Sequence, residues 1–188
     1  MGELDEIARR AWRRTIPIAI GGFVVGAVIG VFLPGSDSAL GRFLSVVGFG
    51  LSVGGLSGTF SLLTASFRLT PSLQWPLRGL GRADRRGVRR AVISGQPIEP
   101  RDSELARRAF DWAHGAAVAL PVSLGQFLLL YAGIAGPQVP NVIRDDAWNP
   151  EFPRVFIAAL VVVAIVFSVV LGRQIRGARR YLAATSGQ

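Results

Sequence analysis

Four long stretches of this sequence contain no charged side chain, and they limit the possible folds more than any other feature. The stretches are residues 15–36, 43–67, 115–136 and 155–172. A helix of roughly 20 apolar residues is long enough to cross the hydrocarbon core of a bilayer, which is about 30 Å thick. Because apolar residues also make up 50% of the whole chain, the sequence predicts an all-α integral membrane four-helix bundle.

The segments outside these four spans are polar and differ in character. We expect an amphipathic N-terminal helix over residues 1–14, an arginine-rich linker with two helices over 68–114, an extracytoplasmic loop over 137–154 and a basic tail over 173–188. With the N-terminal helix, the two linker helices are expected to form a collar of juxtamembrane amphipathic helices.

The basic residues are concentrated on one predicted side of the membrane. All 21 are arginine, and the N-terminal segment, the linker and the tail hold every one except Arg42, Arg144 and Arg154. Because arginine-rich loops stay on the cytoplasmic side, both termini and the linker are predicted to be cytoplasmic. This topology already explains the net charge of +9, and the linker lacks interleaved aromatic residues, so no nucleic-acid partner is expected.

The four tryptophans and the start of the chain bear on the same topology. Trp12, Trp75, Trp112 and Trp148 lie just outside the spans, where an indole ring prefers the headgroup region. A cleaved signal peptide is the alternative interpretation of the first span, with small residues near Ser36 as the cleavage site. We favour a span, because the apolar run is long for a signal peptide.

Glycines recur at every fourth position in the first two spans. The positions are Gly22, Gly26 and Gly30 in the first span, and Gly50, Gly54 and Gly58 in the second. Residues spaced by four share one helix face, and small residues let helix backbones approach closely inside a bilayer. Since the connecting loop is short, the two spans are predicted to pack as an antiparallel hairpin.

The fourth span carries a milder form of the same pattern in Ala164, Ser168 and Gly172. Two interpretations of these small-residue faces remain open. Either they hold the four helices of one chain together, or one face docks a second copy or another membrane protein.

The first linker helix is predicted from about Ala83 to Ser94, closed by Gly95, and the second begins after Pro100 with Asp102 or Ser103 as its cap. In the first helix, an apolar face of Val88, Ala91 and Val92 lies opposite four arginines, Arg85, Arg86, Arg89 and Arg90. A short basic amphipathic helix beside a bilayer is expected to lie in the interface, with its arginines on anionic lipid headgroups.

Residues that carry chemistry are scarce. The chain has no cysteine, and none of the four spans contains an ionisable residue. Ser123 and Gln126 are the most polar candidates in the third span, where they would form interhelical hydrogen bonds or line a pore. The single histidine, His114, is insufficient for a typical metal site. We therefore predict no catalytic residue, no metal and no cofactor.

The outer loop contains adjacent carboxylates, Asp145 and Asp146, flanked by Arg144 and Trp148. These groups suit a cation or a basic partner. Adjacent side chains seldom converge on one ion, so a solvated loop is the favoured interpretation.

The run RRGVRRAVISGQPIEPRDSELARRAFDWA, residues 85–113, resembles the cytoplasmic linker of uncharacterised small four-span membrane proteins of high-GC Gram-positive bacteria. In those proteins an arginine-rich helix, a Gly-x-Pro break and an Ala/Arg helix precede the next span. The resemblance implies a bacterial plasma-membrane location and no particular activity.

Three functional hypotheses follow. The first is a non-catalytic membrane protein that acts by helix–helix association, as an accessory or regulatory subunit or as a homo-oligomer. The second is an oligomeric channel or small-solute transporter. The third is a lipid-handling membrane enzyme whose linker arginines hold a phosphorylated headgroup.

Overall fold

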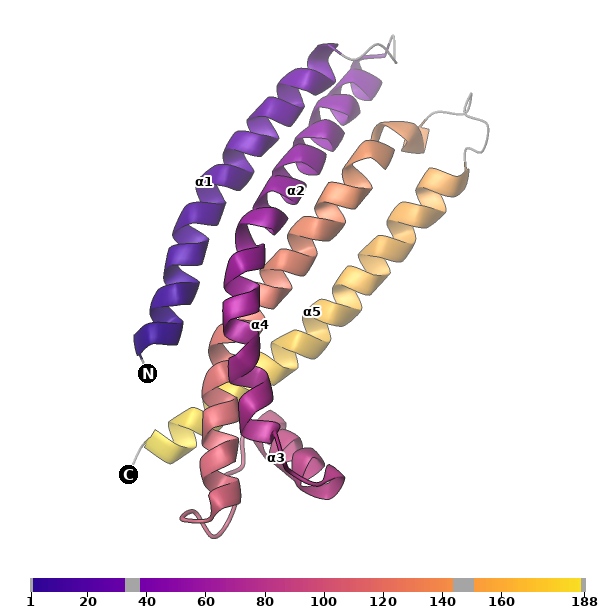
Figure 1. Ribbon diagram of the computed structural model, residues 1–188. Coiled ribbons are helices and arrows are strands. Elements are labelled where there is room, and N and C mark those ends of the chain that lie inside the picture. The colour runs from indigo at the N-terminus through magenta and orange to yellow at the C-terminus, as the bar shows by residue number, and fades with distance from the viewer. Residues whose placement is uncertain (1, 33–37, 144–150, 187–188) are drawn as a thin grey trace. The chain divides into compact units, whose positions relative to one another are not determined.

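The computed structural model describes residues 2–32, 38–143 and 151–186, and this part of the chain is helical without any β-strand (Figure 1). The helices are α1 (Gly2–Phe32), α2 (Ala39–Gln74), α3 (Arg82–Ser94), α4 (Glu104–Ala135) and α5 (Glu151–Ser186), joined in part by the short 3-10 turns η1 (Trp75–Leu77), η2 (Gly136–Gln138) and η3 (Pro140–Ile143). Four of them, α1, α2, α4 and α5, are long and apolar enough to cross a membrane. The all-α prediction with four apolar helices is therefore confirmed.

The long helices continue well past the apolar intervals. The N-terminal segment and the first apolar stretch form one helix, α1, and α2 continues beyond Phe67 to Gln74. At the other end of the chain, α5 begins at Glu151 and includes most of the expected basic tail. These extensions are polar, so the hydropathy of the sequence does not show where the helices end.

The chain divides into two compact units, each of which is described by itself. The first, which we call the Arg-rich unit, contains Met1–Arg9, Thr64–Leu124 and Phe167–Gln188. The second, the Gly-rich unit, contains Arg10–Leu63 and Gly125–Val166.

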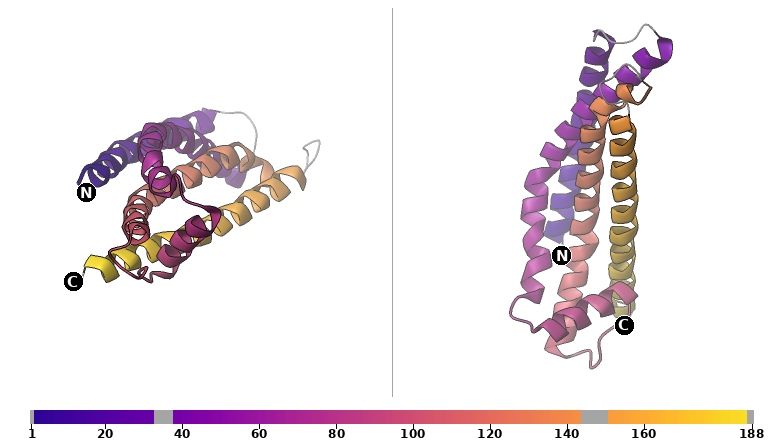
Figure 2. Two further views of the ribbon diagram at one scale, coloured as in Figure 1. Left: turned by 60° about the horizontal axis from the view of Figure 1, so that its bottom comes forward. Right: turned by 90° about the vertical axis from the view of Figure 1, so that its right-hand side faces the viewer.

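The Arg-rich unit has a hydrophobic core of its own, contributed by α3, α4, α5 and the turn after α2. Its buried members are Leu77, Val88, Val92, Ala109, Trp112, Ala113, Ala116, Leu120, Ala178 and Tyr181. Figure 2 shows α3 crossing the adjoining parts of α4 and α5. Small residues permit this close crossing: a Cβ built on Gly177 of α5 would overlap the backbone carbonyl of Ile93. The Arg-rich unit thus has the buried core and close helix crossings of a small helical domain.

The ends of the two linker helices follow from local sequence. Gly95 adopts a left-handed conformation with φ of 74°, and the N–H of Gln96 donates to the carbonyl of Ala91 at 3.0 Å, which is a Schellman stop. Ser103 caps α4, because its Oγ accepts the N–H of Ala106 at 3.2 Å. Of the two caps considered, Ser103 and not Asp102 accepts this capping hydrogen bond.

Two side-chain placements refine the sequence analysis. Val88 and Val92 are both 0% exposed, so the apolar face of α3 packs on protein and not on a lipid surface. Trp112, expected just outside its span and on a face of the second linker helix that could pack against its neighbour, is 6% exposed and belongs to the core. Both placements arise because α4 and α5 extend beyond their apolar intervals and offer a protein surface of small residues, including Ala109 and Ala178.

In the Gly-rich unit, α1 and α2 approach backbone to backbone along the predicted glycine faces. A Cβ built on Gly22 would lie 3.1 Å from the Cα of Gly54, and one built on Gly26 would overlap the carbonyl of Phe49. Along the same face, a Cβ on Gly30 would lie 2.6 Å from the carbonyl oxygen of Ser45. A partly buried hydrogen bond reinforces the pair, in which Thr15 Oγ1 donates to Ser61 Oγ at 2.9 Å.

A second face of α2 is equally close to α4 in the same unit. A Cβ on Gly55 would lie 2.6 Å from the N of Gly133, and one on Gly48 would lie 2.5 Å from the carbonyl oxygen of Gly136 in η2, directly after α4. The indole ring of Trp12 occupies the space beside Gly125 that a larger side chain would need. These contacts place small residues of α2 against two neighbouring helices, a packing that the spacing of four by itself did not predict.

Candidate functional site

The arginines of α3 form an exposed row on the side opposite its buried valines. Arg82, Arg86, Arg89 and Arg90 are all exposed, and Ile93, which is 42% exposed, lies among them on the helix surface. None of these four guanidinium groups forms a hydrogen bond or salt bridge with the described residues. Arg85 differs, because its Nε donates to the carbonyl of Leu80 at 2.9 Å. Arg85 is also exposed, so the predicted set of Arg85, Arg86, Arg89 and Arg90 stays a prediction, and Arg82 is a further exposed arginine of the same helix.

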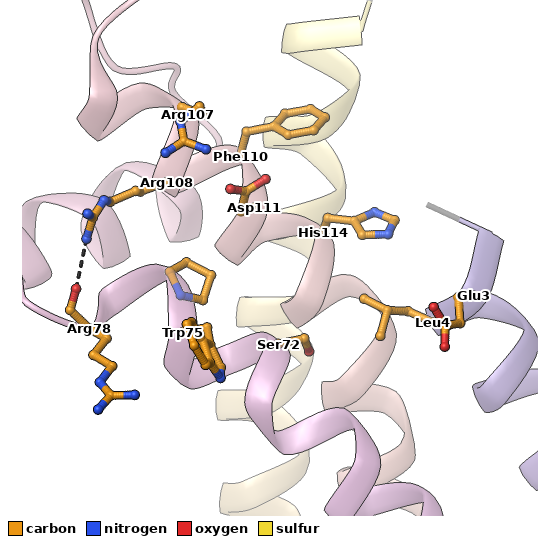
Figure 3. A pocket seen from close by; sticks show the side chains of 11 residues that line it. Glu3, Leu4, Ser72, Trp75, Arg78, Arg107, Arg108, Phe110, Asp111 and His114 are labelled. Carbon is orange, nitrogen blue, oxygen red and sulfur yellow. Dashed lines mark hydrogen bonds between the residues drawn. The ribbon is translucent and has the colours of Figure 1, made fainter.

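A cavity of about 650 Å³ lies in the Arg-rich unit, where the start of α1, the end of α2 with η1, and α4 meet (Figure 3). Its lining combines three arginines, two carboxylates, a histidine, a serine and four apolar residues: Arg78, Arg107, Arg108, Glu3, Asp111, His114, Ser72, Leu4, Trp75, Pro76 and Phe110. We call it the α1–α2–α4 cavity.

The cationic end of this cavity is pre-arranged. The guanidinium of Arg78 lies over the ring of Trp75 at 5.5 Å from its centroid, in a cation–π contact. Arg108 Nη1 donates to the carbonyl of Arg78 at 2.8 Å. The Arg78 side chain makes no hydrogen bond or ion pair with the described part of the chain. Its donors are therefore available to a ligand.

Arg107 and Arg108 are held by a shared partner, Glu104, which contacts each of them at 2.8 Å. Their hydrogen bonds hold the pKa of the Glu104 carboxyl down at about 2, and the same pairing raises the pKa of Arg107. A lowered carboxyl pKa means that the pairing is complete above the ordinary glutamate range and is lost only as the pH falls towards about 2. The pair is solvent-exposed, so it orients these side chains more than it stabilises the fold.

The other end of the cavity carries Glu3 and Leu4 from the start of α1, with His114 and Asp111 of α4 between the two ends (Figure 3). His114 Nε2 is enclosed and has no hydrogen-bond partner among the described residues. A buried nitrogen without a partner costs about 1–3 kcal/mol.

We expect His114→Phe to leave the free energy of unfolding unchanged or to raise it by about 1 kcal/mol, because it removes an unsatisfied nitrogen and keeps an aromatic ring. Thermal unfolding of the detergent-purified protein measures this. His114→Asn is the control, since it retains an enclosed polar group and is expected to destabilise. A loss of stability in His114→Phe larger than in His114→Asn would contradict the assignment.

The remaining predicted site residues are spread over both units. Ser123 and Gln126 are half-buried on α4, and Gln126 has a partner within the chain. Ala164 and Ser168 are less exposed than their α5 neighbours, whereas a Cβ on Gly172 would meet nothing within 4 Å. The helix thus has open space beside Gly172, whereas Gly177, five residues further along α5, is closely packed. Asp145 and Asp146 lie outside the described residues.

Sequence reasoning did not predict the α1–α2–α4 cavity. Its charged residues come from three separate segments, and none of them forms a recognised motif. Among the described residues there is no group of three or more His, Cys, Asp or Glu side chains that would suit a metal ion.

No protein-family model, curated protein or solved structure matches this chain.

Proposed function

We propose that this chain is a multi-pass protein of a bacterial plasma membrane, with four spans and both termini in the cytoplasm. The four long apolar helices support the number of spans. The arginine distribution along the sequence supports the orientation, since arginine-rich segments are retained on the cytoplasmic side. In this topology the Arg-rich unit lies at the cytoplasmic surface.

Its proposed role is non-catalytic: it acts by association, as an accessory or regulatory subunit that holds a folded helical unit against the inner leaflet. The observation that carries this proposal is α3, whose apolar face is buried in protein while four unpaired arginines point away from the core. Anionic headgroups are the proposed partner of this row. Each arginine near such a surface contributes about 1 kcal/mol, so the row would hold the unit there firmly.

The glycine faces support internal packing over docking of a second copy. Gly26 and Gly54 are occupied by the backbone of the facing helix in the same chain. In the most apolar 18-residue window of α5, by contrast, 0% of the residues are buried, and in a bilayer such a face meets acyl chains.

The two other functional hypotheses gain less support. A pore lined by small residues of α2 conflicts with their contacts, because Gly55 is already close to α4 and Gly48 to the turn η2 that follows it. A lipid-handling enzyme would need a nucleophile hydrogen-bonded to a general base beside the arginines. The α3 row has no such pair, and in the α1–α2–α4 cavity Ser72 Oγ donates to the carbonyl of Leu69 and His114 Nε2 has no hydrogen-bond partner within the described ranges.

The α3 row is tested with a fluorescent label, which the absence of cysteine makes simple. In Ile93→Cys carrying a polarity-sensitive dye, we expect a blue shift of emission in vesicles that contain phosphatidylglycerol and none in pure phosphatidylcholine. Raising the salt from 0.1 M to 1 M shortens the screening length from about 10 Å to about 3 Å, so the shift should be reversed.

The matched control replaces Arg82, Arg86, Arg89 and Arg90 by glutamine in the same labelled protein, which should abolish the shift. Equal emission in both kinds of vesicle would count against headgroup binding by α3.

A further inference from the structure

The charges at the α1–α2–α4 cavity balance once the carboxylate that pairs with two of its arginines is included, which bears on what the cavity can bind. Arg78, Arg107 and Arg108 face Glu3 and Asp111, and Glu104, outside the lining, is the partner of two of the arginines. The three cations are thus matched by three carboxylates. A site for a simple anion would carry a larger excess of positive charge, so these charges together suit a ligand that carries both signs.

The two signs are also separated in space. In Figure 3 the three arginines lie at one end of the cavity and Glu3 lies at the other, with Asp111 and His114 between them. A ligand that fits must therefore have its anionic and cationic groups apart, joined by a short spacer. The apolar residues Leu4, Trp75, Pro76 and Phe110 provide walls for such a spacer and for an attached chain.

Arg78 is the residue best prepared to bind the anionic group. Trp75 orients its guanidinium, and no described carboxylate occupies it. Guanidinium groups bind phosphate oxygens through two parallel, charge-assisted hydrogen bonds. At the other end, a carboxylate such as that of Glu3 is a natural acceptor for an ammonium group.

We propose that the α1–α2–α4 cavity binds a phosphate ester that also carries a primary amine, the chemistry of an aminophospholipid headgroup. The phosphate lies against Arg78, with Arg107 and Arg108 beside it, and the ammonium lies towards Glu3 and Asp111. The inference rests on the proposed topology, which puts this cavity at the level of the inner-leaflet headgroups, and it does not depend on the α3 row. A water-soluble phosphate ester with an amine would satisfy the same groups.

The test is native mass spectrometry of the full-length protein in mild detergent, titrated with short-chain phosphatidylethanolamine, phosphatidylglycerol and phosphatidylcholine. We expect phosphatidylethanolamine to bind about tenfold more tightly than the other two, because only it supplies both the phosphate and an ammonium able to donate hydrogen bonds. Competition by soluble phosphoethanolamine distinguishes the source of the ligand: effective competition identifies a soluble ester, and its failure identifies the lipid.

Two substitutions of exposed residues separate the two ends of the site. Arg78→Gln is expected to weaken binding of all phosphate lipids, whereas Glu3→Gln should remove only the preference for phosphatidylethanolamine. The variant with four α3 glutamines should keep that preference, so failure of the cavity and failure of the α3 row are distinguishable. Equal binding of the three lipids, or binding unaffected by Arg78→Gln, would overturn the proposal.

Discussion

Gly26→Ala is expected to drive α1 away from α2 and to lower the free energy of unfolding by about 3 kcal/mol. The added Cβ would overlap the main-chain carbonyl of Phe49. No rotamer change relieves this overlap, because one atom is the alanine Cβ and the other belongs to the main chain of Phe49. Only separation of the two helices makes room, and it would also weaken the neighbouring contacts of Gly22 and Gly30. Thermal or denaturant unfolding in detergent measures the loss.

Gly21→Ala is the matched control on the same helix, because a Cβ there would meet nothing within 4 Å. It is expected to be neutral or slightly stabilising, since alanine has the higher helix propensity. If the two alanine variants unfolded alike, the close approach of α1 and α2 would be refuted.

Trp112→Ala is expected to be the most damaging change in the Arg-rich unit, at about 3–5 kcal/mol. The indole is 6% exposed and contributes to the core on which α3 packs. Its loss leaves a cavity in the core that also contains Val88 and Val92, so α3 should open locally before the rest of the chain unfolds. Limited trypsin digestion reports this directly, because α3 carries a row of exposed arginines that become cleavable when the helix opens.

Trp75→Ala provides the comparison within the same unit. This ring is 68% exposed, so its removal should leave trypsin resistance and thermal stability nearly unchanged, while lipid binding in the α1–α2–α4 cavity should weaken. Similar trypsin sensitivity in both variants would show that Trp112 does not organise the core.

The parts of the fold that the sequence predicted are those that depend on local signals. Hydropathy within one window identifies an apolar helix whatever it packs against, so the four long helices are recovered. The end of α3 is equally local, because Gly95 supplies the left-handed conformation that a Schellman stop needs. The glycines of α1 and α2 lie on facing surfaces because the short connection leaves few other arrangements.

The parts that the sequence did not predict depend on contacts between distant segments. The indole of Trp112 has the same amphipathic character at a headgroup boundary and in a helical core, and only the packing of α3 and α5 decides between them. Likewise, the sequence of α3 is that of an amphipathic helix on a lipid surface. Only the structure shows that its valines are buried with alanines of α4 and α5. In the α1–α2–α4 cavity Glu3 shares a lining with residues more than sixty positions away. The spacing of these residues in the sequence does not predict that they meet.

The two close faces of α2 have a consequence for how this sequence can vary. A Cβ built on Gly26, Gly54 or Gly55 would overlap a backbone atom of a neighbouring helix, so larger residues are excluded at these positions. Along α5, where Val162 is 59% and Ile165 57% exposed, exchange among apolar residues changes little. Homologous chains should therefore diverge quickly along α5 and retain the close-packed glycines of α2, so these glycines are the positions by which distant homologues would be recognised.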